Sequence, residues 1–354
     1  MEYGIQLATS AHHWKVVKRA EEMGFSHAWF YDTELLNADV FVAMAAAAMH
    51  TSRIKLCTGV LIPSNRIAPV AASALASLNA LAPGRIVCAM STGFTARRTV
   101  GLPAITLKRL EEYIRVVRAL LAGETVEWSE EGGPHKIRFL NPELGLINID
   151  DPIPMHISAF GPKGRTLAAK LGTGWMSGGN PRGAAAALNA MRQEWEKAGR
   201  DTKDLYATTF GNGCVLAEGE AADSPRARAQ AGPSATMLFH DAAESEELGT
   251  LGFRLPPQFQ PILDAYREIY QRYEPADARY LSNHRGHLMF LRPEEQALIT
   301  PELLRTLTYT GTESEMVAAV RQVKDSGFNQ FAVTLRVGHE FDMLADWAKV
   351  LEKV

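Results

Sequence analysis

Residues 54–90 read IKLCTGVLIPSNRIAPVAASALASLNALAPGRIVCAM and contain a complete strand–helix–strand unit. Ile54–Val60 and Arg85–Met90 are short apolar runs, which predict buried strands. Between them, Pro69–Leu81 is rich in Ala and Leu and has proline near its first turn, which predicts a helix. Two strands separated by a helix predict parallel pairing through a right-handed crossover.

The same alternation continues in both directions along the chain. Further strands are expected at Tyr3–Ala8, His27–Tyr31, Pro154–Ala159, Gly174–Met176, Ala207–Leu216 and Gln330–Leu335. Further helices are expected at His13–Met23, Asp39–His50, Leu107–Leu121, Arg165–Lys170, Ala184–Lys197, Glu313–Lys324 and Phe341–Leu351. Eight such units predict an α/β fold, a TIM (β/α)8 barrel, with an open doubly wound sheet as the alternative.

Three stretches, near 92–106, 122–151 and 218–310, interrupt this rhythm. The second contains a plausible hairpin formed by Thr125–Trp128 and Lys136–Phe139. The third has helical segments near Pro261–Tyr273 and Pro301–Leu307, so we interpret it as a lid rather than a long structureless loop. No low-complexity linker separates these stretches from the rest, and we expect one barrel domain over residues 1–354.

Composition excludes several classes of protein. The 354 residues carry a formal charge of −3 with no basic run, so we expect neither nucleic-acid nor membrane partners. Three scattered cysteines, Cys57, Cys88 and Cys214, form no CxxC pair, which argues against a disulfide framework. The N-terminus lacks the pattern of a signal peptide, and no apolar run is long enough to span a bilayer. We therefore expect a cytoplasmic protein.

Side chains just beyond the strand ends are the first candidates for chemistry, because the carboxyl ends of barrel strands surround the active site. His12 and His13 follow the first strand, and Asp32 follows the second. Carboxylates and imidazoles transfer protons, so these three are the catalytic candidates. A simple role at a helix terminus is the alternative for Asp32 and His13.

Gly and Ser residues are concentrated at the ends of the middle strands, in Ser91–Gly93, Ser158–Gly164 and Ser177–Asn180. Such loops expose backbone N–H groups, and two of them lead into expected helices. This arrangement suits a phosphate or another anion. Tight turns between strand and helix are the alternative explanation.

Basic residues outside the strands suggest where a charged ligand group binds. Arg66 and Arg97 are candidates for an anionic group of substrate or cofactor, with loop attachment or solvent exposure as the alternatives. His284, Arg285 and His287 lie in the long insertion and are candidate lid residues over the substrate.

Metal and serine chemistry find no support. His12 and His13 are adjacent and do not point to one site, and His284 and His287 have no third ligand at suitable spacing. No G-x-S-x-G motif occurs, and no G-x-G-x-x-G follows the first strand. We expect no bound metal.

Several segments together resemble one family. They are Thr51–Val60, Pro63–Arg66, Ser77–Ile86, Leu120–Glu124, Ser158–Pro162, Gly172–Trp175 and Tyr309–Thr312. As a set they resemble the luciferase-like oxidoreductases, which include bacterial luciferase, flavin-dependent monooxygenases and F420-dependent reductases and dehydrogenases. The resemblance covers nearly all of the chain except the long insertion.

The resemblance implies a TIM barrel with a flavin or F420 at the carboxyl ends of its strands. It implies a non-proline cis peptide at Gly59–Val60 that supports the ring from behind. The ring edge would meet Ala8, Thr58 and Gly93. Phosphate contacts would come from Ser158, Gly161, Pro162, Gly164, Ser177, Gly178 and Gly179.

The choice of cofactor rests on one short motif. F420-dependent members often carry Asp-His after the second strand, whereas this chain has Asp32-Thr33. We therefore favour reduced FMN, supplied by a flavin reductase, and a monooxygenase of a small organic substrate. Hydride transfer by F420 is the first alternative, and a non-catalytic flavin-binding barrel is the second. A homodimer through helices near Val40–Met49 and Pro69–Leu81 is also expected.

Overall fold

The computed structural model describes residues 1–130, 132–178, 183–250 and 252–354. Eight parallel strands form a closed barrel in the order β1-β12-β9-β8-β7-β4-β3-β2. Their bounds are Glu2–Leu7 (β1), His27–Phe30 (β2), Lys55–Leu61 (β3), Ile86–Met90 (β4), Met155–Ser158 (β7), Gly174–Ser177 (β8), Ala207–Gly211 (β9) and Gln330–Thr334 (β12). The predicted TIM barrel is confirmed, and the open sheet is excluded.

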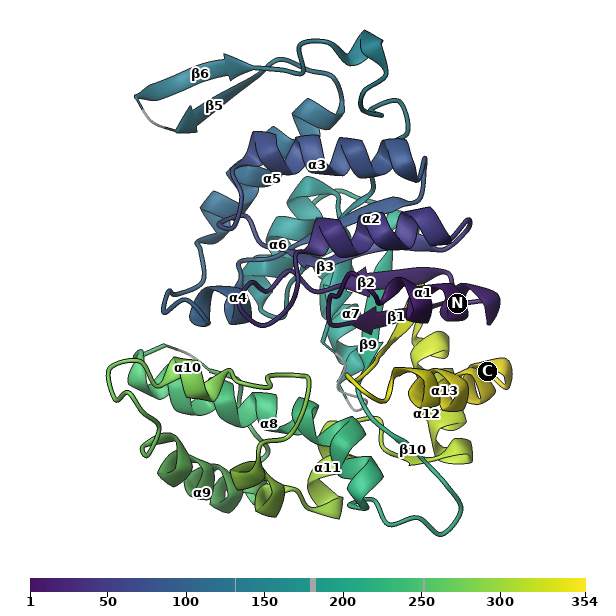
Figure 1. Ribbon diagram of the computed structural model, residues 1–354, viewed down its shortest axis with the longest axis vertical. Helices are drawn as coiled ribbons and strands as arrows, with labels where there is room; N and C mark the ends of the chain where they lie inside the picture. Colours follow the sequence, from purple (N-terminus) through teal and green to yellow (C-terminus); the bar gives the residue numbers. More distant parts are fainter. Residues whose placement is uncertain (131, 179–182, 251) are drawn as a thin grey trace.

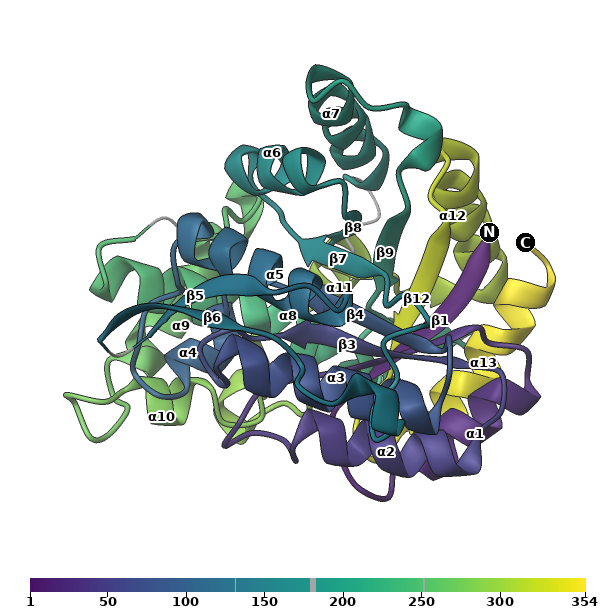
Figure 2. The ribbon, with the colours of Figure 1, turned by 90° about the horizontal axis from the view of Figure 1, so that it is seen from above.

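Helices surround the barrel, as Figure 2 shows for α1, α2 and α3 on one side and α6 and α7 on the other. Their bounds are Trp14–Glu22 (α1), Val40–His50 (α2), Ala68–Leu81 (α3), Leu107–Leu121 (α5), Pro162–Leu171 (α6), Ala184–Lys197 (α7), Glu313–Ser326 (α12) and Glu340–Glu352 (α13). Helix α6 starts three residues earlier than expected, because Pro162 takes the first helical position.

The first two insertions are small. The one after β4 contains the short helix α4, Phe94–Arg98, which the sequence analysis did not predict. The second forms a hairpin of β5, Val126–Glu130, and β6, Gly133–Ile137, followed by a 3₁₀ turn at Pro142–Leu144. In Figure 1 this hairpin projects from the body of the molecule.

The third insertion is mostly helical. It contains α8 (Pro225–Glu247), α9 (Gln260–Tyr270), α10 (Tyr280–Asn283) and α11 (Pro301–Leu307), with 3₁₀ turns at Pro257–Phe259 and Pro293–Leu298. The expected strand Ala207–Leu216 is divided into β9 and a separate β10, Val215–Leu216, which pairs with β11, Gly311–Thr312. Helix α8 was not predicted, because the Gly232-Pro233 pair in its interior is typical of a turn rather than of a helix.

The core has two layers around the barrel wall. Large side chains such as Phe30, Trp175 and Phe331 fill the space between strands and helices. The barrel interior holds a smaller cluster: Trp29, Cys57, Val87, Ala89, Met176, Phe210 and Ala332. Because successive strand residues alternate between faces, positions two or four residues beyond these point into the carboxyl-end opening of the barrel, here called the mouth.

The long insertion, here called the lid segment (residues 218–310), has its own core. Phe239, Tyr266, Tyr270 and Leu303 from α8, α9 and α11 are buried together. Figure 1 shows α8, α9 and α10 grouped beside α4. That residues 1–354 form one domain stays a prediction.

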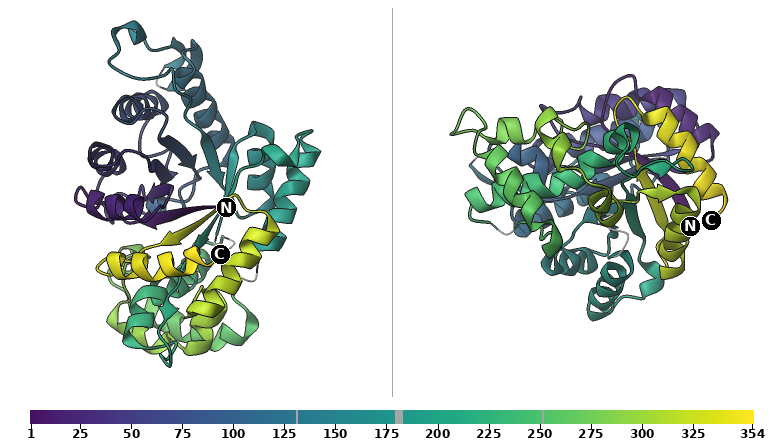
Figure 3. Two further views of the ribbon diagram at one scale, coloured as in Figure 1. Left: turned by 90° about the vertical axis from the view of Figure 1, so that its right-hand side faces the viewer. Right: turned by 90° about the horizontal axis from the view of Figure 1, so that it is seen from below.

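The two chain ends lie near each other in both views of Figure 3. Within the described residues, no helix is long and apolar enough to cross a membrane. Helices α2 and α3 expose Val42, Met49 and Val70 to solvent. A homodimer through this face stays a prediction.

Candidate active site

The amino-terminal half of the barrel interior is filled. Trp29 Nε1 donates a hydrogen bond to Gln330 Oε1 at 2.8 Å, and Gln330 Nε2 donates to Tyr206 Oη at 3.3 Å. His27 and His156 lie in the same layer, and burial lowers the pKa of each to about 3, so both are neutral. The interior is therefore closed at this level, and space for a ligand lies towards the mouth.

Five polar side chains, here called the polar arc, occupy one half of the mouth. They follow the inward positions of β1, β2, β9 and β12 and are Gln6, Tyr31, Asn212, Thr334 and Arg336. Thr334 Oγ1 donates to Gln6 Oε1 at 2.9 Å, and Gln6 Nε2 donates to the carbonyl oxygen of Gly59 at 3.3 Å. These bonds connect the arc to the opposite wall.

The other half of the mouth is lined by small residues. The inward positions at the ends of β3, β4, β7 and β8 are Gly59, Ser91, Ser158 and Gly178. A Cβ atom on Gly59 would lie 2.9 Å from the Cβ of Trp29, and one on Gly178 would lie 2.8 Å from the Phe160 ring. Neither position has room for a larger residue, so this half keeps a flat, open wall.

The peptide bond between Gly59 and Val60 is cis, as the resemblance implies. The register between β3 and β4 shifts at this point, between Thr58 and Leu61. The Thr58 hydroxyl donates to the carbonyl of Ala89 at 2.9 Å and accepts from its N–H at 3.0 Å. Thr58 thus holds the irregular ladder together, and its contact with a cofactor stays a prediction.

Asp32 forms an ion pair with Arg66, so the structure joins a catalytic candidate to a substrate candidate. Arg66 Nη1 lies 2.9 Å from Asp32 Oδ1, and the N–H of Ile62 donates to Asp32 Oδ2 at 2.9 Å. Arg66 Nη2 also contacts Glu34 and Asp39, at 3.4 and 2.8 Å. Three carboxylates share one guanidinium on the rim between β2 and β3.

The pKa of Asp32 is raised to about 7. Burial is the main cause, Arg66 opposes it, and the negative charge of Glu34 adds to it. A carboxyl group with this pKa suits proton transfer near neutral pH, but its partners hold it at the rim. The catalytic role of Asp32 stays a prediction.

The two histidines after β1 have different surroundings. His12 is exposed. The His13 ring is hydrogen-bonded through Nδ1 to the carbonyl oxygen of Ala8 at 2.6 Å, and its Nε2 lies 3.5 Å from Glu340 Oε1. His13 therefore connects the end of β1 to α13, and its catalytic role, like that of His12, stays a prediction.

The rim after β4 is held by Gly93 and Arg97. Gly93 has a φ of 82°, and a Cβ there would lie 2.7 Å from Ile62. Arg97 Nε donates to the carbonyl oxygen of Pro103 within the same loop. The structure thus brings Gly93 close to β3, while Arg97 folds back on its own segment.

The predicted phosphate loop begins at the end of β7. Ser91 Oγ donates to the carbonyl oxygen of Ser158 at 3.1 Å, and Gly161 and Pro162 begin α6 without a side-chain cap. A Cβ on Gly164 would lie 2.8 Å from Ala159. The first-turn N–H groups of α6 are therefore available to an anion.

The end of β8 completes that side of the mouth. Ser177 is buried, and its hydroxyl donates to the carbonyl oxygen of Gly178 at 3.4 Å. Gly179, the last predicted phosphate contact, lies outside the described residues.

The lid segment contacts three parts of the rim. Phe253 packs edge-on against Phe94 and Phe160, with ring centroids 6.0 and 5.7 Å apart. Ser234 Oγ accepts a hydrogen bond from Arg336 Nη2. These contacts place the segment over the carboxyl ends of β4, β7 and β12, where a lid was expected.

Two of the predicted lid residues lie in a buried polar network. His284 Nε2 is hydrogen-bonded to Glu244 Oε2 at 2.7 Å, and the Nδ1 atoms of His287 and His240 are 3.0 Å apart. His287 Nε2 also lies 3.2 Å from Thr95 Oγ1, at the rim of β4. These contacts do not reach the polar arc, so substrate contact by either histidine stays a prediction.

The rest of that network is anchored by ion pairs. His240 Nε2 lies 2.6 Å from Glu295 Oε1, and Arg292 Nη2 forms an ion pair with the same carboxylate. Arg98 Nη1 pairs with Asp241 Oδ1 at 2.9 Å. Among the described residues, no group of three or more His, Cys, Asp or Glu side chains is arranged to bind a metal.

Arg285, the third predicted lid residue, is exposed. Its role over the substrate stays a prediction.

Sequence reasoning missed Arg336 and Tyr31, the two polar-arc residues with the most unusual surroundings. Tyr31 was taken as the last residue of a strand, and Arg336 directly follows the predicted strand Gln330–Leu335. The rule that singled out Asp32, namely position just beyond a strand end, would also have found Arg336.

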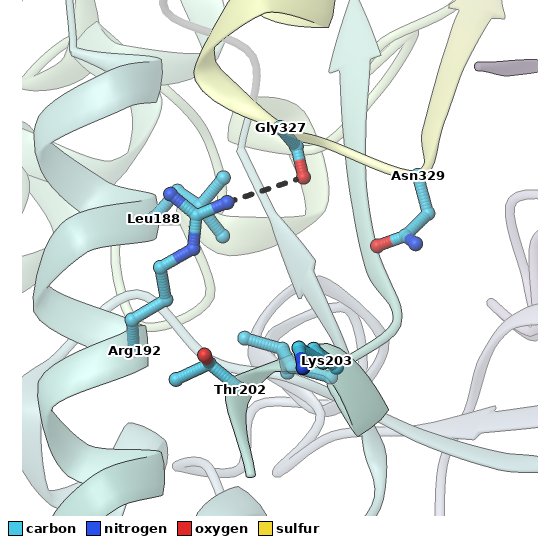
Figure 4. A pocket seen from close by; sticks show the side chains of 7 residues that line it. Leu188, Arg192, Thr202, Lys203, Gly327 and Asn329 are labelled. Atoms are coloured by element: carbon cyan, nitrogen blue, oxygen red, sulfur yellow. Dashed lines mark hydrogen bonds between the residues drawn. The ribbon is translucent and has the colours of Figure 1, made fainter.

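Two surface pockets lie outside the mouth. One, of about 480 Å³, lies at the amino ends of β9 and β12 and is lined by Leu188, Arg192, Thr202, Lys203, Leu205, Gly327 and Asn329 (Figure 4). The other, of about 300 Å³, lies between α8 and the segment after β12, with Ala229, Val337 and His339 among its lining residues. Only the second borders the carboxyl-end face.

Comparison with known proteins agrees with this geometry. The model of the family described as luciferase-like monooxygenase matches residues 4–330. The chain belongs to this family. A 5,10-methylenetetrahydromethanopterin reductase of Methanolobus tindarius is 30% identical over 236 residues, which cover 64% of this chain and 69% of that protein. An F420-dependent hydroxymycolic acid dehydrogenase of Mycobacterium tuberculosis is 31% identical over 52% of this chain and 54% of that one.

Solved structures of this family share the fold over the whole chain. The coenzyme F420-dependent tetrahydromethanopterin reductase of Methanopyrus kandleri has a TM-score of 0.72 at 17% identity, covering 100% of this chain and 99% of that one. The oxygenating component of 3,6-diketocamphane monooxygenase from Pseudomonas putida, in complex with FMN, has a TM-score of 0.63 at 13% identity, covering 100% and 96%. The chain is therefore a luciferase-like oxidoreductase.

Proposed function

We propose that this protein is an F420-dependent oxidoreductase that catalyses hydride transfer to or from a small organic substrate. The observation that carries the proposal is that relatives at about 30% identity include dehydrogenases named as F420-dependent. These relatives favour F420 over the FMN-dependent monooxygenase expected from the sequence. The matched segments cover only 46–64% of this chain, so the substrate is not carried over from them.

The mouth fits a flat tricyclic ring. On one side, Gly59 and Gly178 leave a wall without side chains, and on the other the amide of Gln6 presents hydrogen-bonding groups. The uncapped first turn of α6, which begins at Pro162, suits a phosphate group. These residues would hold the cofactor.

Bound F420 would supply hydride chemistry at its ring. The protein would orient the substrate, exclude water from the mouth and hold the protons of its polar side chains. Tyr31 carries the phenolic hydroxyl of the polar arc. Burial raises the pKa of Tyr31, and the neighbouring Arg336 guanidinium opposes that rise. The hydroxyl stays protonated at neutral pH and is able to donate a hydrogen bond to a substrate oxygen. The lid segment over the mouth keeps bulk water away from the bound substrate.

A side-by-side titration tests the proposal. Purified protein is titrated with F420, oxidised FMN and reduced FMN under anaerobic conditions, and binding is followed by cofactor fluorescence and absorbance. We expect F420 to bind at least tenfold more tightly than either form of FMN. Tighter binding of reduced FMN would overturn the assignment of F420.

The FMN-dependent monooxygenase is the second candidate, and one observation favours it. Thr33 stands where F420-dependent members often have a histidine that accepts a proton. The two nearby histidines do not replace it, because His12 is exposed and His13 is bound to the carbonyl oxygen of Ala8. In this case the protein would depend on a flavin reductase for reduced FMN. Oxygen consumption that requires reduced FMN and a substrate would support this candidate, and unchanged redox kinetics of either bound cofactor would indicate a non-catalytic binding protein.

A further inference from the structure

Arg336 is a fully buried cation at the mouth of the barrel. Its side chain has no exposed surface, and it lies two residues beyond Thr334 on the inward side of β12. Nη2 donates to Ser234 Oγ on α8 and, at 3.4 Å, to Asn212 Oδ1. Nε and Nη1 have no hydrogen-bond partner in the described part of the chain.

No carboxylate of the described residues forms an ion pair with Arg336. The neighbouring group that acts on its charge is the Tyr31 hydroxyl, which lies close to the guanidinium but does not meet it at hydrogen-bond geometry. Burial lowers the pKa of Arg336. A buried guanidinium without a counter-charge is costly, and folded proteins keep such groups where something compensates them.

We propose that Arg336 binds the anionic group, a carboxylate or phosphate, of the substrate in the proposed hydride-transfer reaction. Nε and Nη1 point their unpartnered N–H groups to different edges of the guanidinium, and an oxyanion at either edge accepts a charge-assisted hydrogen bond. The Tyr31 hydroxyl is a further donor for such an oxyanion, and Ser234 and Asn212 hold the guanidinium through Nη2. The inference rests on the proposed function for the identity of the ligand as a substrate.

The placement of Arg336 favours a substrate over a cofactor group. It lies in the polar arc, across the mouth from the small-residue wall where the ring would bind. The first turn of α6 follows β7, whereas Arg336 follows β12, and the two strands are separated in the barrel by β8 and β9. The groove of about 300 Å³ lined by Val337 and Ala229 lies next to it, on the outer surface of the same face.

Binding of inorganic phosphate to the cofactor-free protein tests the proposal. Thermal unfolding is measured in rising phosphate at constant ionic strength, for the natural protein, Arg336→Met and Arg336→Lys. Arg305→Met is the matched control, because Arg305 forms an exposed pair with Glu315 on α11. We expect phosphate to raise the midpoint by several degrees in the natural protein and in the control, but not in Arg336→Met.

Arg336→Lys should bind phosphate about tenfold more weakly than the natural protein, since a lysine ammonium does not place donors at the positions of both Nε and Nη1. Equal midpoint shifts in the natural protein and Arg336→Met, or no shift in either, would overturn the proposal. It would also be overturned if Arg336→Met bound F420 tenfold more weakly, because the guanidinium would then serve the cofactor. Absence of F420 binding with Arg336-dependent phosphate binding intact would count against the proposed function alone.

Discussion

Two buried arginines, Arg292 in the lid segment and Arg336 in the mouth, differ in one respect. Both side chains are almost completely inaccessible to solvent. Arg292 contacts the carboxylates of Glu295 and Glu294, and Tyr266 accepts a further hydrogen bond from it. Arg336 contacts only neutral groups. A compensated charge stabilises the lid segment, and an uncompensated one indicates where a charged ligand binds.

Two buried carboxylates show the same contrast. Glu295 receives hydrogen bonds from both His240 and Arg292, and although burial acts to raise its pKa, these partners lower it to about 2. Asp32 shares Arg66 with two other carboxylates, and its pKa is raised to about 7. The ratio of cations to anions around a buried carboxylate therefore decides the direction of its shift.

The largest expected effect is the loss of the compensated arginine. Arg292→Met leaves Glu295 buried with only a neutral histidine beside it, so we expect the free energy of unfolding to fall by about 3–5 kcal/mol. Urea unfolding followed by circular dichroism measures this. The control Arg305→Met removes an exposed pair and should cost about 0–1 kcal/mol. Equal losses in the two variants would show that the buried pair of Arg292 and Glu295 stabilises the protein no more than an exposed pair does.

The pKa of Glu295 predicts a pH effect of intermediate size. Because its pKa is lower in the folded protein than in the unfolded chain, its contribution to stability is present above about pH 4.5 and is lost as the pH falls towards about 2. Glu295→Gln should flatten this part of the stability profile, measured by urea unfolding at several pH values. A variant profile parallel to that of the natural protein would contradict the assignment.

Asp32 predicts a smaller effect of opposite sign, because its partners Glu34 and Asp39 are partly exposed and screened by solvent. Its folded-state pKa of about 7 lies above the usual 3.8, so the folded protein holds a proton that the unfolded chain releases. Stability should therefore fall as the pH rises from about 4 to about 7. Asp32→Asn should remove this decline, while Asp39→Asn, which changes a more exposed carboxylate, should keep it.

The smallest expected effect is at the uncompensated arginine. Arg336→Met removes a buried charge that has no partner, so the unfolding free energy of the cofactor-free protein should change by less than about 1 kcal/mol, or increase. The same urea experiment decides it. A loss as large as that of Arg292→Met would show that Arg336 is required for folding. The two arginines would then not differ in their contribution to stability.

The barrel and the location of its mouth were predictable from the sequence, because alternating strands and helices report local periodicity. The cis peptide at Gly59–Val60 followed from the family resemblance and is present. The pairing of Asp32 with Arg66 was not predictable, since the two residues are 34 positions apart and face each other only across adjacent rims. Ser234 and Arg336 are 102 positions apart, and helix α8, which carries Ser234, was itself missed.

Arg98 gives the lid segment a second consequence. It stacks on Phe94 with its guanidinium carbon 3.9 Å from the ring centre, and it also pairs with Asp241 and donates to Ser245 on α8. Arg98 therefore connects helix α4 to the lid segment through buried polar contacts. Because α4 begins directly after Gly93, any displacement of α8 that kept these bonds would also displace the turn at Gly93.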